Sequence, residues 1–467
     1  MAVMKVYQGV LVPSLVLTLW HASGFLPYPI RTSPGTLVHR ISACVLPVYT
    51  LLLLILYGYF FAIELILFTR TYHDDLLRLE FFTMFILLYR EYYFALPLVV
   101  LFLLLLRRNA YPSILISVED AIGSCLTRQQ IRIVRLFHYL AWAVLLTVSA
   151  GVSICNYYGF QRLLKKLAVI IPGTTKDSVQ PLSIIPGGVV SHGVLLWIYE
   201  FANSYASLCW SAPTTLILGL TIAIGFGFDN GAKELRRMVK ERALRASLKY
   251  DFEVCERIAE LRNEHRRLRG AITTINSGAT LTIIMTTFGD ILMPITLISR
   301  AFQVDDKAHV LVKLQNEALV YNVYFFAVCA LLLAALRLAC YVWMNEKAQN
   351  VKTHLHTLSH HGTSEMIREV ARSFEQEIAE HPQEMAISGG GFFSVDKNFA
   401  ATLFGIVLTY FLIIYQQKDQ KGDMEKLSEE QQTAFASLTR QIMQLNQRLN
   451  ETSSGCAAGE LLQIPIK

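Results

Sequence analysis

Residues 41–68 read ISACVLPVYTLLLLILYGYFFAIELILF and contain one charged residue, Glu64. A membrane-spanning helix needs about 20 mostly apolar residues, and the stretch lacks the polar–apolar alternation of a barrel strand. Six further stretches qualify or come close: Leu79–Leu106, Leu136–Tyr158, Gly188–Phe228, Ile272–Ser299, Ala318–Met344 and Asn398–Gln416. The sequence therefore predicts an all-α membrane protein with seven transmembrane helices.

The composition supports this class. Hydrophobic residues make up 53% of the 467 residues and charged residues 17%, whereas soluble chains average about 25% charged. This balance excludes an ordinary soluble enzyme and a disordered chain. The net charge of +6 is too small to indicate a nucleic-acid partner. The eight cysteines are scattered without a CxxC pair, so neither a disulfide framework nor a zinc site is indicated.

The fourth stretch, Gly188–Phe228, is about twice the length that a membrane requires. We interpret it as one long helix, kinked or interrupted near Pro213, because only Asn203 and Ser204 break its apolar run. Seven spans with a cytoplasmic N-terminus then place 24 Lys and Arg residues in the inner segments and 14 in the outer ones. Positive residues accumulate on the cytoplasmic side, so this orientation is favoured.

This topology predicts the organisation of the chain. The expected parts are a cytoplasmic N-terminal segment with a juxtamembrane helix (1–40), spans one to four (41–228), a cytoplasmic helical anchor region (229–271), spans five and six (272–344), a cytoplasmic loop and helix (345–397), the last span (398–417) and an extracellular amphipathic tail (418–467). The run Val10–Trp20 also resembles a secretory signal, which is the competing interpretation of the N-terminal segment.

The anchor region mixes Glu and Arg with apolar residues at helical spacing. The apolar positions are Leu244, Leu248, Phe252, Ile258, Leu261 and Leu268. Such a pattern is typical of helices that leave the membrane and pack within the chain or against identical subunits. Contact of the arginines with anionic lipid is an alternative.

Catalytic signatures are missing from the sequence: there is no GxxxxGK[ST] loop, HExxH or GxSxG. His354, His356, His360 and His361 fall within eight residues, but only Glu365 lies close by as a carboxylate, and Gly362 interrupts the segment. We therefore expect neither an enzyme nor a cofactor or metal.

Ionisable residues inside a membrane are costly unless they are paired or hydrated, so they are functional candidates. The ionisable residues in or near the predicted spans are Glu64, Arg90, Glu91, Glu200, Asp290, Arg300 and Arg337. Glu64, Arg90, Glu91 and Arg300 suit span ends, whereas Glu200 and Asp290 lie in the outer halves of their spans with polar and aromatic residues beside them. A cavity open to the outside could bind a small polar or aromatic molecule there. The ligand-binding candidates are Asn156, Trp197, Glu200, Asp290, Tyr321 and Tyr324. Alternatively, the aromatic candidates are residues of the kind that membrane proteins commonly place at the membrane–water interface.

The last span carries a recognisable pattern. Thr409-Tyr410, five residues and Gln416-Gln417 close it, and Gly391-Phe392-Phe393 with Asp396 precede it. Gly24-Phe25-Leu26-Pro27-Tyr28 precedes the first span. These motifs resemble the insect gustatory receptor family, part of the seven-helix insect chemoreceptor superfamily. The family ends its motif with Gln-Phe, so Gln417 is a departure.

The resemblance implies a plasma-membrane, ligand-gated cation channel of four identical or related subunits, opened by a small tastant. It implies that the last helix of each subunit lines the pore, that the ligand pocket lies among the outer halves of spans two to six, and that subunits meet at the cytoplasmic helices. The ligand class, sugar or bitter compound, is left open, as is homomeric or heteromeric assembly.

The residues of the last helix suit such a pore. Thr409, Ile413 and Gln416 are spaced i, i+4 and i+7 and share one face. Four copies of Ile413 would form an apolar ring that gates by dewetting, and four copies of Gln416 would offer amide oxygens to a cation. Tyr410 belongs to the same motif, and Gln417 would add a second polar ring.

The tail after the last span has a short heptad-like pattern and a glycosylation sequon at Asn450-Glu451-Thr452. Use of the sequon would place the tail outside the cell. Three other protein classes remain possible from the sequence: a G-protein-coupled receptor, which would need an external N-terminus, a secondary transporter using Glu200 and Asp290, and a membrane enzyme.

Overall fold

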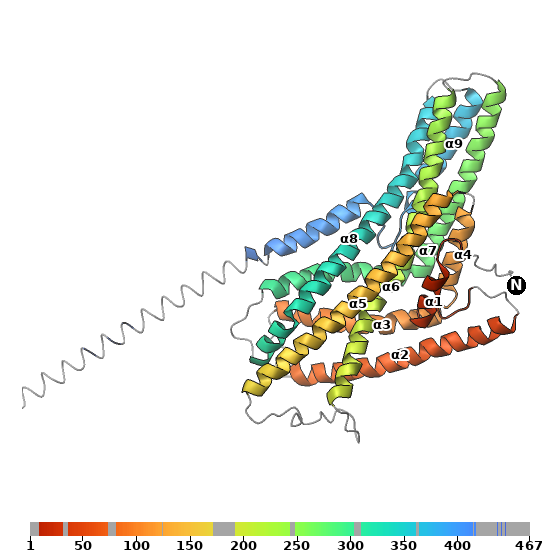
Figure 1. The fold of residues 1–467 in the computed structure, drawn as a ribbon. Helices are drawn as coiled ribbons and strands as arrows, with labels where there is room; N and C mark the ends of the chain where they lie inside the picture. The colour runs from red at the N-terminus through yellow and green to blue at the C-terminus, as the bar shows by residue number, and fades with distance from the viewer. Residues whose placement is uncertain are drawn as a thin grey trace, which may run out of the picture. The chain divides into compact units, whose positions relative to one another are not determined.

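The computed structural model confirms the all-α fold, and the described part of each of the seven apolar stretches lies in a helix (Figure 1). The helices are α1 (Ser14–Ala22), α2 (Leu37–Tyr72), α3 (Phe81–Leu106), α4 (Ala110–Ile122), α5 (Arg128–Ile170), α6 (His192–Arg242), α7 (Leu248–Phe302), α8 (Val310–His360) and α9 (Glu365–Glu380), followed by the short 3₁₀ helix η1 (Pro382–Met385) and the C-terminal helix Lys397–Ile413.

The structure describes residues 9–30, 36–72, 81–123, 125–170, 192–242, 248–302, 310–360, 364–413 and 415–416, together with 437, 440 and 444, and the side chains of part of these ranges. The chain divides into two units, Met1–Val407 and Leu408–Lys467. Helices α1 to α9 belong to the first unit, and the C-terminal helix Lys397–Ile413 extends from the first unit into the second.

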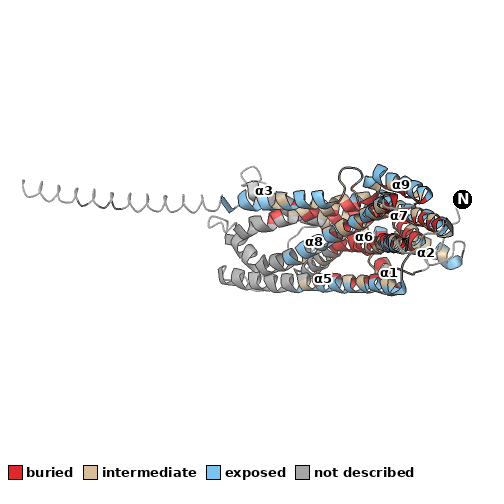
Figure 2. Cartoon of the chain, turned by 90° about the horizontal axis from the view of Figure 1, so that it is seen from above, coloured by how far each residue is buried: buried red, intermediate tan, exposed pale blue. Residues whose placement is uncertain are grey.

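Helix α6 is the central helix of the first unit, and it contacts α5, α7, α8 and α3. In its most apolar window 82% of the residues are buried, compared with 11% in α2. The colouring by burial in Figure 2 agrees, because much of the described part of α6 is drawn as buried. From His192 onward, the fourth apolar stretch thus lies in a single helix, with Pro213 inside it. The exposed apolar side chains of α2, such as Leu52 and Ile55, suit contact with lipid.

Three of the described helices are long and apolar enough to cross a membrane by themselves: Leu37–Ala62, Arg128–Gly151 and Ser204–Glu241. A fourth span arises if Ala95–Leu106 and Ala110–Ile122, bent by 71°, count as one. Helix α4, the second part of that pair, lies between the second and third predicted spans, in a segment that a cytoplasmic N-terminus would place in the cytoplasm. Its Ile114, Leu115 and Val118 are fully buried, and it packs against α7.

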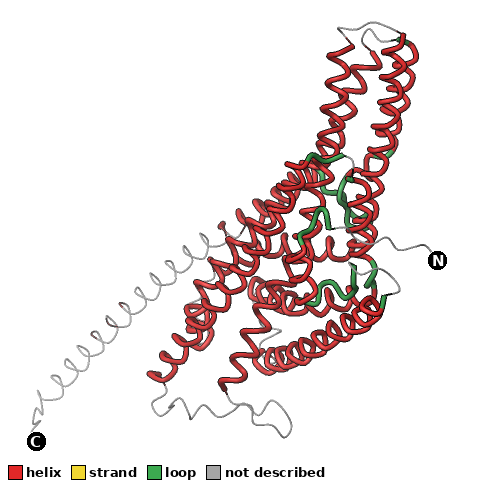
Figure 3. The backbone as a smooth tube through the Cα atoms, turned by 45° about the vertical axis from the view of Figure 1, so that its right-hand side comes forward, coloured by secondary structure: helices red, strands yellow, loops and turns green. Residues whose placement is uncertain are grey.

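The ends of α6, α7 and α8 extend beyond the apolar stretches and lie beside α9, as Figures 1 and 3 show. In α9 the buried residues are Ile367, Ala371, Phe374 and Ile378, spaced by four, three and four. This stripe gives α9 one apolar face, which contacts α7 and α8. On α7, Ile258, Leu261 and Leu268 are buried as expected, whereas Phe252 is 65% exposed. We call this four-helix assembly the anchor.

The N-terminal segment packs into the helix bundle. Leu17 and Trp20 of α1 and the following Phe25 are almost fully buried, and Trp20 contacts the rings of Tyr111 and Trp142. The Tyr205 hydroxyl donates to the Ser23 carbonyl at 2.8 Å. Because side chains of α4, α5 and α6 enclose it, residues 9–30 form part of the core of the first unit.

We predict that Gly24→Ala destabilises this packing. Gly24 has φ +78°, and a Cβ there would lie 2.7 Å from Leu53 Cδ1. The substitution should lower the free energy of unfolding by about 1–3 kcal/mol, measured as a lower thermal midpoint of the detergent-solubilised protein. Gly231→Ala is the matched control, since a Cβ at that helical position meets nothing within 4 Å. Equal midpoints for the two variants would contradict the prediction.

Candidate functional site

An ion pair joins three helices in the interior of the first unit. Arg337 of α8 donates through Nη2 to Asp290 Oδ1 of α7 at 2.6 Å and through Nη1 to Thr214 Oγ1 of α6 at 2.9 Å. Asp290 is 8% exposed and Arg337 6%. Removing either charge from water is expensive, so each side chain requires the other at this position.

The pair continues a line of buried polar residues on α7. Thr286 and Thr282 lie one and two turns from Asp290 on the same face of the helix, and both are buried. Thr286 donates to the Thr282 carbonyl at 2.7 Å, and the Tyr111 hydroxyl donates to Thr282 Oγ1 at 3.3 Å. These hydroxyls are satisfied by helix carbonyls or by one another, which lowers the cost of burying them.

Asp290 is the one ligand-binding candidate from the sequence whose side chain is described, and its partner is Arg337. The sequence analysis identified both charges but did not pair them. The other candidates, Asn156, Trp197, Glu200, Tyr321 and Tyr324, lie on α5, α6 and α8, with side chains outside the described set. Their role in ligand binding stays a prediction.

The C-terminal helix Lys397–Ile413 begins at a well-formed cap. The Asp396 carboxylate accepts a hydrogen bond from the Phe399 amide at 2.8 Å, the bond that an N-cap residue makes with the third residue of a helix. A tight turn precedes it, in which Gly390 and Gly391 have φ of +59° and +87°. The Phe393 ring stacks on Phe399 at 5.0 Å between centroids.

The side chains of Thr409, Ile413 and Gln416 are exposed, and Tyr410 is half-buried. Gln417 and Asn450 lie outside the described residues. The apolar Ile413 is 44% exposed. Leu408, Leu412 and Tyr415 are exposed as well, so exposure in the single chain does not distinguish the predicted pore face from the rest of the helix.

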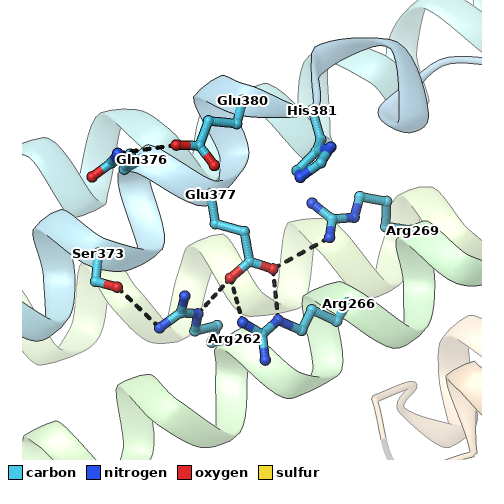
Figure 4. A pocket seen from close by; sticks show the side chains of 8 residues that line it. All are labelled: Arg262, Arg266, Arg269, Ser373, Gln376, Glu377, Glu380 and His381. Carbon is cyan, nitrogen blue, oxygen red and sulfur yellow. Dashed lines mark hydrogen bonds and ion pairs between the residues drawn. The ribbon is translucent and has the colours of Figure 1, made fainter.

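A cluster of opposite charges fastens α9 to α7 in the anchor (Figure 4). Arg266 makes two bonds to the Glu377 carboxylate, at 2.6 and 2.7 Å, and Arg262 and Arg269 bond the same group. The three arginines are spaced i, i+4 and i+7 and so occupy one face of α7. Their bonds, those of Arg266 foremost, hold the pKa of Glu377 at about 2, although partial burial acts in the opposite direction.

His265 lies beneath this cluster, between the rings of Phe228 and Phe374 at 4.9 and 5.5 Å. Burial lowers the pKa of His265 to about 4, and the charge of Arg269 acts in the same direction. The ring is therefore neutral at pH 7. In the same region His356 Nδ1 lies 3.2 Å from Glu375 Oε1, and the described residues hold no group of three or more metal ligands.

These features define a helical membrane protein with an internal ion pair, a polar-tipped last helix and a charged anchor. Among solved structures, the chain resembles the insect olfactory receptor OR5 from Machilis hrabei in complex with eugenol, with a TM-score of 0.53 and 13% identity. A second structure of OR5 gives a TM-score of 0.52 and 12% identity. Both matches cover 86% of this chain and 97% of the receptor. The chain thus has the fold of that receptor over nearly its whole length.

The comparisons of sequence alone found no relatives. No family profile matches the chain. No curated protein matches it either.

We predict that the anchor loses stability in acid. The pKa of Glu377 is lower in the folded chain than the usual value near 4.5, so its contribution is complete above that pH and is lost as pH falls towards 2. Neutral His265 adds to the loss below its usual pKa of 6.5. Glu377→Gln should therefore lower the thermal midpoint at pH 7, and the difference from wild type should shrink below pH 4.5.

Glu380→Gln is the matched control for this measurement. Glu380 lies one turn from Glu377 and accepts a bond from Gln376 at 3.0 Å. It should change the thermal midpoint much less than Glu377→Gln. A deficit for Glu377→Gln that stays constant from pH 7 to pH 3 would contradict the assigned role of the carboxylate.

Proposed function

We propose that this chain is a subunit of a ligand-gated cation channel of the insect chemoreceptor superfamily, and that it is of the gustatory type, opened by a small tastant. The observation that carries the proposal is the likeness in fold to OR5 over 97% of that receptor. The Thr409-Tyr410 and Gln416 pattern of the last helix adds the gustatory assignment, since this pattern resembles that family.

The pore of this channel is lined by the last helix of four subunits. Thr409, Ile413 and Gln416 share a face whose side chains are exposed in the single chain. An exposed isoleucine between two polar positions suits a narrow passage, because a ring of four such side chains dewets and blocks ions until the helices move apart. Gln416 and Gln417 then supply polar oxygens at the end of the passage.

The anchor supports subunit assembly in this proposal. Packing of α9 on α7 and α8 through an apolar stripe and the Glu377 cluster makes it a firm unit. Its exposed Phe252 provides apolar surface for a second subunit. The ligand is a small molecule that binds among the outer halves of the helices, near Asn156, Trp197, Glu200, Tyr321 and Tyr324. Asp290, the sixth candidate, would lie at the inner end of this region, where its carboxylate is bonded to Arg337.

The subunit lies in the plasma membrane with the N-terminus and the anchor in the cytoplasm and the tail after Gln417 outside. The excess of Lys and Arg in the inner segments supports this orientation.

The glycosylation sequon tests the orientation. We predict that Asn450 is glycosylated when the chain is expressed in insect cells, so that enzymatic deglycosylation increases its mobility on a gel, and that Asn450→Gln abolishes the shift. An epitope tag at the N-terminus should be reached by antibody only after permeabilisation. Labelling of the N-terminal tag on intact cells would overturn the orientation.

The activity itself is tested by recording. We expect cells that express the chain, without added G protein, to respond to at least one member of a panel of sugars and bitter compounds with a non-selective cation current. A response that requires a G protein would indicate a receptor of another class, and substrate uptake without conductance would indicate a transporter.

Ile413→Ala should give a leaky channel. Four smaller side chains widen and wet the proposed ring, so the resting conductance should rise about tenfold or more. Leu408→Ala removes the same kind of side chain from another side of the helix and should leave the resting conductance near that of wild type. Equal resting conductance in both variants would count against the pore assignment.

A further inference from the structure

Asp290, Arg337 and Thr214 meet at the part of α6 where a proline removes one backbone hydrogen bond of the helix. Thr214 directly follows Pro213, which has no backbone N–H, so the hydrogen-bond ladder of α6 lacks one bond there. Thr214 and Thr215 both donate their hydroxyls to the Ser211 carbonyl, at 3.0 and 2.6 Å. Arg337 thus bonds α6 at the level where that helix bends most easily.

The contact also lies between two functional regions. Helices α6, α7 and α8 each run without interruption from this level into the anchor. In the other direction, Glu200 on α6 and Tyr324 on α8 lie about 20 Å away along their helices, at 1.5 Å per residue. The contact is therefore placed between the outer helix ends, which carry candidate ligand-binding residues, and the anchor.

We propose that Asp290, Arg337 and Thr214 form a clamp that sets the resting state of the channel. They are positioning residues: the clamp ties the three helices together, and the binding of a ligand among their outer ends has to work against it. This inference rests on the proposed channel function. A buried charge pair suits this role, because separating it leaves two charges without partners in an apolar environment. Partly separated arrangements are therefore costly, and the contact has two distinct states, formed and broken.

The direction of the effect follows from this arrangement. If ligand binding moves the outer parts of the helices relative to the anchor, a bond at the intermediate level resists the movement. Weakening the bond lowers the energy of the moved state relative to the resting state. The channel should then open more often without a ligand.

Thr214→Val tests the clamp with a small change. Valine has the shape of threonine but cannot accept a hydrogen bond, so the Arg337 Nη1 bond is lost while α6 stays packed. We expect the resting cation conductance to rise about tenfold, the change in an equilibrium constant for a charged hydrogen bond of modest strength. Thr214→Ser keeps the acceptor and should restore the wild-type value.

Thr221→Val is the matched control. Thr221 lies on the same helix, is fully buried and bonds only the Ile217 carbonyl of α6 among the described contacts. It should leave the resting conductance unchanged at equal surface expression, measured by biotinylation. A Thr214→Val channel with wild-type conductance would overturn the clamp, as would an equal rise in Thr221→Val.

The pairing of Asp290 with Arg337 is tested by measuring surface expression, because a variant that fails to fold also gives a result in this measurement. Asp290→Asn or Arg337→Gln alone leaves one buried charge without its partner and should reduce surface expression several-fold. The double variant removes both charges and should recover most of the loss. Additive losses would contradict the pairing.

The outcomes separate the clamp from the channel function. If Ile413→Ala conducts at rest and Thr214→Val does not, the clamp fails and the channel stands. If neither the wild-type chain nor Ile413→Ala carries cation current under any tested compound, the channel function fails and the clamp fails with it.

Discussion

Hydrocarbon offers the backbone no hydrogen-bond partner, and this constraint governs the architecture of the chain. Every apolar stretch has to be a helix whose N–H and C=O groups are satisfied internally. Once α6, α7 and α8 are formed, continuing them into the anchor costs little, because each further residue adds another internal bond. Helices of 51, 55 and 51 residues result, and they connect the apolar bundle to the anchor without a flexible joint.

The same chain uses ion pairs in two environments with different consequences. In the anchor, three arginines share the Glu377 carboxylate near water, where the bonds set the register between α7 and α9 at a modest net gain. In the bundle, Arg337 and Asp290 are almost fully buried, so solvent cannot readily replace their bond. The anchor cluster therefore loses its contribution to stability as pH falls from about 4.5 towards the lowered pKa of Glu377, whereas the internal pair resists any movement that would separate its partners.

The sequence predicted the parts of the fold that depend on local pattern. The seven helices follow from hydropathy, and the buried face of α7 follows from the spacing of Ile258, Leu261 and Leu268. The absence of a polar turn predicted α6 as one long helix, kinked or interrupted near Pro213, and the helix runs on through that residue. Contacts between distant residues were not predicted. Asp290 and Arg337 are 47 positions apart, and periodicity carries no information on which charges meet. The place of Trp20 was also ambiguous, because its position depends on contacts with distant residues. A short apolar run has the same pattern in a secretory signal, in an interfacial helix and in a helix of the core.

The central claim is that the last helix lines a cation pore. Introducing a charge at the polar end of this helix tests the claim most directly. Gln416 was assigned there from its spacing with Thr409 and Ile413, and its side chain is exposed. Single-channel conductance to cations should be compared between Gln416→Glu and Gln416→Lys, which add charges of opposite sign at the same position of each subunit. The account predicts a larger cation conductance for Gln416→Glu than for wild type and a much smaller one for Gln416→Lys. Equal conductance in the two variants would contradict it.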